Sequence, residues 1–529
     1  MTRARNVADI IKQPFTTTLG TSNYRAGVNA GNSITSGGNY NVLIGDEAGT
    51  ALTTGDQSVL IGYAAGDAIT TASDNTAVGY NNLANNTSGA SNVAIGSRSM
   101  QANTSGANNV AMGFQSLTAN TTASNNTAVG YQAGKAVTTG IQNTFIGGSA
   151  GASITEALQN VAVGYGTLDA DTLGARNVAV GTNSLTTQNF TSATNVYNVG
   201  VGYFSGANLT TGVNNTIIGG LAGAFATTAD TSTFVGYQAG QGITGAKLTG
   251  NNNTAVGAFS GLNLQGTGHD NTFVGIKSGT SVTTGHRNTY IGFEAGDATQ
   301  TVADNTAVGF RALSGAAGAS NTAVGKNSLL VAASDAASNT AVGAAAGEGV
   351  TSGVNNLLLG NAAGTSASPG GNITTASNTI TLGNNNIATA NIKVDWTVSS
   401  DQRDKTDFTA LDLGLEFVKA LNPVTYKWDE RSNYGDRTED DWSLSDQTPD
   451  GTHKKDWLDI GFKAQEVEAL EQAAGYNKSN KTNLTVSLSP DGEQYGMRYS
   501  KFVPILVKAI QEQNALIEAL TARIAVLEG

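Results

Sequence analysis

Ser400 and Lys405 are the two residues of this chain whose types and spacing could support covalent chemistry. A serine hydroxyl is a weak nucleophile until a neighbouring base accepts its proton, and a lysine amine can be that base once desolvation favours its neutral form. The chemistry that such a pair could support is attack on a carbonyl carbon, which is acyl transfer. A serine and a lysine five positions apart also occur in ordinary solvated loops. The spacing alone therefore leaves both interpretations open.

The segments around this pair must position it. Asp401 and Arg403 stand between the two residues, and we expect them to hold the loop rather than to react. Apolar residues recur in a helical rhythm over residues 411–421, which predicts a helix after the loop. Two motifs then follow, Asn-Pro-Val-Thr-Tyr-Lys-Trp at residues 422–428 and Gly-Phe-Lys-Ala-Gln-Glu-Val-Glu at residues 461–468.

Together these motifs resemble the C-terminal intramolecular chaperone of endosialidases, a self-cleaving peptidase family of bacteriophage tail fibres and tailspikes. The Ser-Asp-x-Arg-x-Lys opening and the Ala-Gln-Glu-Val motif carry the resemblance, which covers residues 400–529. It implies a trimeric chaperone that assembles the fibre and then cuts the chain on the N-terminal side of Ser400, with Lys405 as the partner of that serine. Ser399 leaves a one-residue ambiguity in the cleavage point. Self-cleavage is the only enzyme activity implied, and no external substrate is predicted.

The end of the chain has the pattern of a coiled coil over residues 502–528. Apolar residues alternate three and four positions apart, with one polar interruption, in a seam of about four heptads. The residue types at the seam favour a dimer, whereas the family resemblance implies a trimer; we follow the resemblance, because the globular part before the helix can set the order. The alternative is that the stripe packs on its own domain. The seam residues are Val503, Leu506, Ile510, Gln513, Ile517, Leu520, Ile524 and Leu527.

Before this domain, the chain consists of a short repeat. A glycine follows the phrase Asn-Thr-Ala-Val, or a variant of it, in twenty copies that are usually seventeen residues apart. The phrase alternates with the two-residue period of a β-strand, and the period is too short for a pair of helices. The sequence predicts a mainly β fold: a parallel β-roll or β-solenoid of about 17-residue coils, homotrimeric, followed by a small α+β chaperone domain that ends in a coiled-coil helix. The motif glycines are Gly45, Gly62, Gly79, Gly96, Gly113, Gly130, Gly147, Gly164, Gly181, Gly202, Gly219, Gly236, Gly257, Gly275, Gly292, Gly309, Gly325, Gly343, Gly360 and Gly383.

The strand residues of each copy can be assigned a direction. The residue before the glycine is apolar in every copy, for example Ile44 and Val129, and we expect it to face the core. The small residue before it, such as Ala77 or Ala128, is then left outside, and we expect that face to pack against other copies of the chain. Asparagine stands four positions before the glycine in seventeen copies. We expect these amides to hydrogen-bond to one another along the axis.

The repeats also resemble, more loosely, the left-handed parallel β-roll of trimeric autotransporter adhesin heads. Short coils there carry an Asn-x-Ala-Ile/Val-Gly-like phrase. The period is longer here, so the resemblance leaves the handedness and the trimer contact surface open.

Composition separates the repeats from a different C-terminal domain. Of 68 charged residues, 38 lie in the last 130 positions. We expect residues 1–37 to be a virion-attachment segment, residues 38–388 the solenoid shaft, residues 389–399 a neck and residues 400–529 the chaperone domain. The four tryptophans all lie near or beyond the end of the repeats: Trp396, Trp428, Trp442 and Trp457.

Several functional classes are not expected. The chain has no cysteine and only three histidines, without the spacing of metal ligands, so neither a metal site nor a cofactor is predicted. A net charge of −12 argues against nucleic acid as a partner, because phosphate binding needs a basic face. No apolar run of about eighteen residues could span a membrane, and residues 1–15 lack the apolar core of a signal peptide. We therefore expect synthesis in a host cytoplasm and no membrane insertion.

These observations favour a structural fibre protein of a phage virion that mediates host attachment and is extracellular in the mature particle. Its predicted partners are further copies of itself, virion proteins at the N-terminus, and a host glycan or protein receptor. Aromatic residues after the motif glycine, such as Tyr63 and Tyr131, could stack on sugars or cover the subunit seam. The longer loops at residues 182–198 and 237–253 are further candidates for receptor contact. The alternatives are a bacterial-type trimeric surface adhesin and a fibre that retains an uncleaved chaperone cap.

Overall fold

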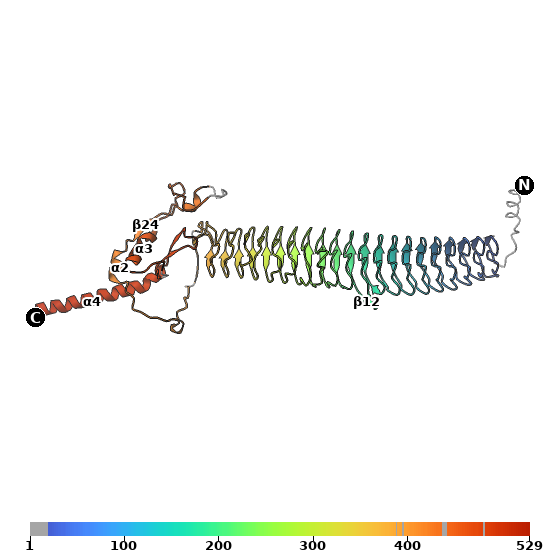
Figure 1. Ribbon diagram of the computed structural model, residues 1–529, viewed down its shortest axis with the longest axis horizontal. Coiled ribbons are helices and arrows are strands. Elements are labelled where there is room, and N and C mark those ends of the chain that lie inside the picture. Colours follow the sequence, from blue (N-terminus) through green and yellow to red (C-terminus); the bar gives the residue numbers. More distant parts are fainter. Residues whose placement is uncertain (1–19, 388, 394–395, 436–441, 480–481) are drawn as a thin grey trace. The chain divides into compact units, whose positions relative to one another are not determined.

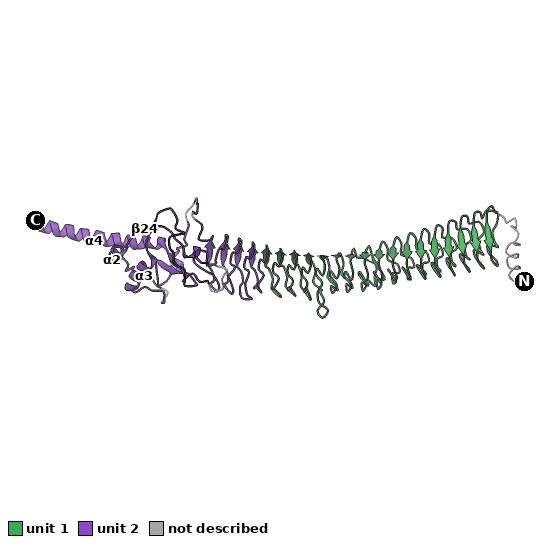
Figure 2. Ribbon diagram, turned by 90° about the horizontal axis from the view of Figure 1, so that it is seen from above, with its two compact units in different colours: residues 1–310 green, residues 311–529 purple. Residues whose placement is uncertain are grey.

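The computed structural model describes residues 20–387, 389–393, 396–435, 442–479 and 482–529. The chain divides into two compact units, Met1–Phe310 and Arg311–Gly529, which Figure 2 colours separately. The described part of unit 1 consists of solenoid coils, whereas unit 2 begins with coils and continues into a small α+β domain that ends in a long helix (Figure 1). The first nineteen residues of the predicted attachment segment lie outside the described residues, and the rest of that segment contains β1 (Tyr24–Ala26), the first strand of the solenoid sheet.

The coils of unit 1 form one parallel sheet, in which each coil contributes a strand of three residues. Neighbouring strands pair in register, so that Thr76 lies beside Val93 and Val93 beside Val110. At the longer coil that leads to Gly202, β10 (Gly174–Ala175) and β12 (Thr194–Asn195) form a separate parallel pair. The strands of the main sheet are β1 (Tyr24–Ala26), β2 (Val42–Ile44), β3 (Val59–Ile61), β4 (Thr76–Val78), β5 (Val93–Ile95), β6 (Val110–Met112), β7 (Thr127–Val129), β8 (Thr144–Ile146), β9 (Val161–Val163), β11 (Val178–Val180), β13 (Val199–Val201), β14 (Thr216–Ile218), β15 (Thr233–Val235), β16 (Thr254–Val256), β17 (Thr272–Val274), β18 (Thr289–Ile291) and β19 (Thr306–Val308).

Unit 2 combines the last coils with the C-terminal domain. The coils contribute the parallel strands β20 (Thr322–Val324), β21 (Thr340–Val342), β22 (Leu357–Leu359) and β23 (Ile380–Leu382). The domain contains two antiparallel pairs, β24 with β25 and β26 with β27. Its elements are η1 (Gln402–Asp404), α2 (Leu415–Ala420), β24 (Val424–Tyr426), η2 (Arg431–Asn433), β25 (Asp459–Gly461), α3 (Ala464–Ala473), β26 (Val486–Leu488), β27 (Tyr495–Met497), η3 (Tyr499–Lys501) and α4 (Phe502–Glu528). The predicted fold class is confirmed, with the homotrimer remaining a prediction.

The strand side chains point in the opposite direction to the one predicted. The middle residue of the strand is the buried one, and Ala77 and Ala128 are both 0% exposed. The residue before the glycine faces outward: Ile44 and Val129 are only half-buried, and Met112 is 39% exposed. The prediction of a core formed by the pre-glycine residues was therefore wrong. Alternation places two neighbours on opposite faces of a strand but does not say which face is inside.

The interior is filled by pairs of large and small residues. Phe145 is fully buried and lies between two glycines, because a Cβ atom at Gly134 or Gly151 would come within 2.7 or 2.4 Å of its ring. In a coil whose middle strand residue is Ala162, a buried leucine, Leu168, occupies the position that corresponds to Gly151. A bulky middle strand residue therefore excludes a bulky residue four positions after the motif glycine of the same coil, and the reverse also holds.

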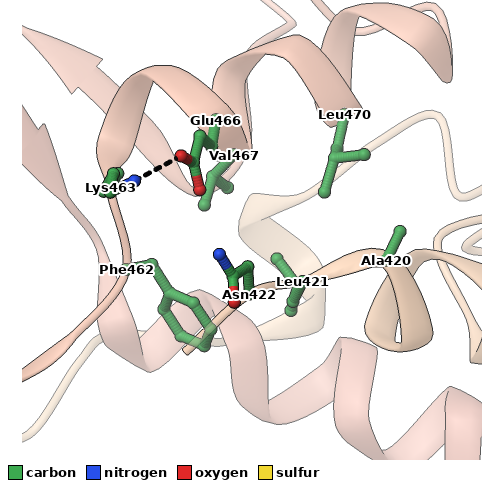
Figure 3. Close-up of a pocket in the computed structure, with 8 residues that line it drawn as sticks. All are labelled: Ala420, Leu421, Asn422, Phe462, Lys463, Glu466, Val467 and Leu470. Carbon is green, nitrogen blue, oxygen red and sulfur yellow. Dashed lines mark hydrogen bonds and ion pairs between the residues drawn. The ribbon is translucent and has the colours of Figure 1, made fainter. Parts of the chain in front are cut away.

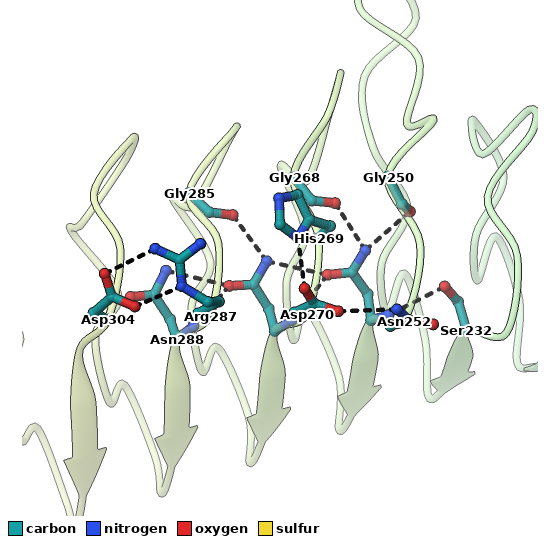
Figure 4. Close-up of polar contacts among 12 residues, drawn as sticks. Ser232, Gly250, Asn252, Gly268, His269, Asp270, Gly285, Arg287, Asn288 and Asp304 are labelled. Atoms are coloured by element: carbon teal, nitrogen blue, oxygen red, sulfur yellow. Dashed lines mark hydrogen bonds and ion pairs between the residues drawn. The ribbon is translucent and has the colours of Figure 1, made fainter.

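The predicted row of amides along the axis is confirmed. Asn109 Nδ2 donates to Asn92 Oδ1 at 3.1 Å and to the carbonyl oxygen of Ala123 at 2.9 Å. The backbone N–H of Asn126 donates to Asn109 Oδ1 at 3.0 Å. Figure 4 shows the same arrangement around Asn288. Because buried amides need partners, each asparagine binds its coil to the next.

The motif glycine is required by its backbone geometry. Gly79 has a φ of +136°, a region that L side chains rarely adopt, and a Cβ atom there would lie 2.7 Å from the carbonyl oxygen of Gly96. Stacked glycines therefore let successive coils approach closely at this turn.

The core of the C-terminal domain is small and is formed by α2, α3, β26 and the start of α4. Leu415 N donates to Glu512 Oε2 at 2.7 Å, so a carboxylate of α4 accepts one of the free N–H groups at the start of α2. The buried apolar side chains of this core are Leu413, Phe417, Val467, Val486, Phe502 and Ile505.

Candidate functional site

Ser400 and Lys405 lie side by side in the structure. Lys405 Nζ donates to Ser400 Oγ at 2.5 Å and approaches the carbonyl oxygen of the same serine at 3.3 Å. The short helix η1 (Gln402–Asp404) reverses the chain between the two residues and so brings their side chains together. Both residues are exposed to solvent in the single chain. The sequence interval alone does not require this contact; the tight turn creates it.

Asp401 and Arg403 hold this turn. Asp401 Oδ1 accepts from the backbone N–H of Arg403 at 2.9 Å, which caps η1, and Arg403 Nη2 donates to Asp401 Oδ2 at 2.6 Å. The guanidinium of Arg403 lowers the pKa of Asp401, and the carboxylate of Asp401 raises the pKa of Arg403. Their side chains are engaged with each other, as expected of residues that position the loop.

The structure shows a contact between the serine hydroxyl and the lysine amine, and both groups are open to solvent. A neutral amine at the position of Lys405 Nζ could take the hydroxyl proton directly, since the two atoms are already within hydrogen-bond distance.

Among the described residues, no cluster of three or more potential metal ligands occurs. Within the same part of the chain, no helix is long and apolar enough to cross a membrane.

The two other sequence motifs of the domain meet around one small cavity. Asn422, after α2, and Phe462, Lys463 and Glu466, around the start of α3, line a space of about 120 Å³ (Figure 3). Lys463 Nζ lies 2.7 Å from Glu466 Oε1. A hydrogen bond from Lys463 lowers the pKa of Glu466, with a smaller contribution from Asn422. The segment that follows α2 and the start of α3 therefore face the same cavity.

Sequence reasoning missed the residues that join the domain to the last coil of unit 2. Lys455 forms an ion pair of 2.6 Å with Glu430, in which both side chains are largely buried, and it also donates to the carbonyl oxygen of Asn385 at 3.2 Å. Asn385 Nδ2 donates to Ser432 Oγ at 3.1 Å. The backbone N–H of Asn372 donates to Asp491. Up to 119 positions separate these partners, and no local pattern in the sequence marks such pairs.

Residues 400–476 match the family model described as chaperone of endosialidase. The match begins at Ser400, includes Lys405 and both later motifs, and ends before α4. No curated protein and no solved structure matches the chain. A domain of this type after a β-solenoid fits a fibre with a C-terminal chaperone.

Proposed function

We propose that this chain is a structural fibre protein of a phage virion, whose C-terminal domain aligns the chains as a trimer and is then released by autoproteolysis before Ser400. The observation that carries the proposal is the contact between Ser400 Oγ and Lys405 Nζ at the first residue of the matched segment. The fibre joins the virion through residues 1–37 and meets a host glycan or protein with its solenoid. In the mature particle it lies outside the cell.

The solenoid needs such an aligning device because its coils are nearly alike. Two chains that are shifted by one coil would still match almost as well, so many registers compete. The helix α4 can select one register, because its apolar seam side chains are largely exposed in the single chain. Val503, Ile517 and Leu527 are 61%, 53% and 79% exposed, respectively. The alternative that this stripe packs on its own domain was therefore wrong, since Phe502, Ile505 and Ala509 face the domain instead.

The proposed cleavage needs only the two residues and one water molecule. The hydroxyl oxygen of Ser400 attacks the carbonyl carbon of Ser399, while the hydroxyl proton moves to the neutral amine of Lys405. The C–N bond between the serines breaks, the nitrogen of Ser400 takes up that proton, and the acyl group remains on the hydroxyl oxygen as an ester. Water then hydrolyses the ester. Ser399 ends in a carboxylate, and Ser400 begins with a free amine and its hydroxyl restored.

Mass spectrometry of the purified full chain tests this step. We expect the wild type to yield fragments 1–399 and 400–529, and Ser400→Ala and Lys405→Ala to stay intact. Ser399→Ala is the matched control; it removes the neighbouring hydroxyl and should still be cleaved. Cleavage of Ser400→Ala at the same bond would contradict the assigned nucleophile.

A fibre that retains its C-terminal domain is the second candidate. It is favoured by the hydrogen bonds that Lys455, Ser432 and Asp491 make with the last coil of unit 2, since these would hold the domain as a cap over the end of the sheet. An intact wild-type chain in stable trimers would support this cap and would remove the catalytic roles of Ser400 and Lys405.

A further inference from the structure

The outer face of the unit 1 sheet consists of two columns of uncharged residues. In the main-sheet strands from β2 to β19, the middle residue is buried, and the first and third residues point away from the coil interior. From β2 to β19, the first residue of each main-sheet strand is valine or threonine, and the third is valine, isoleucine or methionine. The most exposed members of the third column are Met112 (39%), Ile146 (40%), Ile218 (38%) and Ile291 (39%).

Such a face is unusual for a sheet that is left in water. Parallel sheets are normally covered on both faces, and exposed apolar patches of more than a few hundred Å² mark interaction sites. A strip that is three residues long and one strand spacing of about 4.8 Å wide has an area of about 48 Å², and each coil contributes one such strip. The seventeen main-sheet strands of unit 1 therefore form a face of about 800 Å² in projection, which is large enough to hold an interface of the usual size.

We infer that this outer strand face is the surface through which the solenoid packs against second copies of the same chain. The inference rests on the self-association that is part of the proposed function, and it corrects the earlier expectation that the buried alanines would serve this purpose. A second copy fits this face because its coils repeat at the same axial interval. Ridges and grooves then match at every coil, so the whole face can be covered at once.

The charge distribution supports a like partner. The two outward columns of the described unit 1 strands hold no charged side chain, so identical chains bring no like charges together there. The turns that precede the strands are different, because they hold exposed pairs such as Arg287 with Asp304 at 2.7 Å and His269 with Asp270 at 2.7 Å (Figure 4). Those turns are suited to water, whereas the strand face is suited to another apolar surface.

Single cysteines test the inference, because the natural chain has none. Met112→Cys places a thiol on the outer strand face. Ile141→Cys is the matched control, since Ile141 lies in the turn before β8 and is 38% exposed, against 39% for Met112. Each variant of the full chain is labelled with a maleimide, and its mass in solution is measured by light scattering. Ile218→Cys, at 38% exposure on the same face, repeats the test in another coil.

In the native oligomer, we expect the thiols at positions 112 and 218 to react at least about tenfold more slowly than the thiol at position 141, because interface cores pack as densely as protein interiors. All three should react equally in denaturant. An oligomer with equal labelling at all three positions would overturn the inference and leave the proposed function intact. A monomer with equal labelling would overturn both. Protection in a monomer would mean that the chain itself shields these thiols, which also overturns the inference.

Discussion

Single side chains connect elements that are distant in the sequence, and Glu512 is a clear example. Its carboxylate, on α4, accepts the hydrogen bond of the Leu415 amide at the start of α2. This bond lowers the pKa of Glu512, and Lys508 lowers it further. A carboxyl group whose pKa is lower in the folded chain than in the unfolded chain stabilises the fold at a pH above its pKa in the unfolded chain. This contribution is lost as the pH falls through its pKa in the folded chain.

We therefore expect Glu512→Gln to lower the melting temperature of the C-terminal domain at pH 7. The difference from the wild type should shrink as the pH falls below 4.5, the ordinary value for this group, and vanish once the wild-type carboxyl is protonated. Tryptophan fluorescence reports this domain selectively, since no tryptophan precedes Trp396. Glu518→Gln, on the same helix but without a bond to α2, is the control. An equal effect of both variants would show that the bond to Leu415 contributes nothing.

At the scale of the element, each solenoid coil has a core volume that two positions share. Phe145→Ala alone should leave a cavity and cost about 3–5 kcal/mol, whereas Gly151→Leu alone should clash with the Phe145 ring. The double variant recreates the pairing of Ala162 with Leu168 in the next coil, where leucine also adopts a positive φ. We therefore expect it to recover most of the lost stability, as measured by the thermal loss of the β signal in circular dichroism.

The control for this rescue combines Phe145→Ala with Gly223→Leu, which lies beside Phe234 in a distant coil. Its effects should add rather than cancel, because the two sites share no neighbours. If the two double variants were equally stable, the side chains at positions 145 and 151 would not share one core volume.

At the scale of the whole molecule, the proposed trimer depends on the α4 seam. Ile517→Asp places a charge on the seam, where Ile517 is 53% exposed in the single chain. If the seam is an interface, the desolvated charge should weaken assembly by tenfold or more, since a buried unpaired charge costs about 3–5 kcal/mol. Light scattering of the full chain should then show smaller or mixed species. Ala522→Asp, on the opposite side of the same helix, should assemble like the wild type, and an unchanged Ile517→Asp oligomer would refute the seam.

The repeat period, the strand rhythm and the heptad pattern were sufficient to predict the β-solenoid, the amide row and the terminal helix. These features depend on residues that recur at fixed intervals along the chain, so the sequence alone contains the information that predicts them. The five-residue interval allowed a contact between Ser400 and Lys405, and the turn at η1 brings the two side chains together. Their catalytic roles remain a prediction.

Only the tertiary structure decided which side of each strand is inside. Alternation is symmetric between the two faces, and residue size does not decide the choice, because the middle strand residue is buried both where it is the small Ala128 and where it is the large Phe145. The contacts of Lys455 with Asn385 and of Glu512 with Leu415 were equally hidden, because folding brings together residues that are 70 and 97 positions apart. Periodicity is a property of the sequence. Which face of a strand is buried, and which distant residues come into contact, is decided only when the chain folds and packs its core.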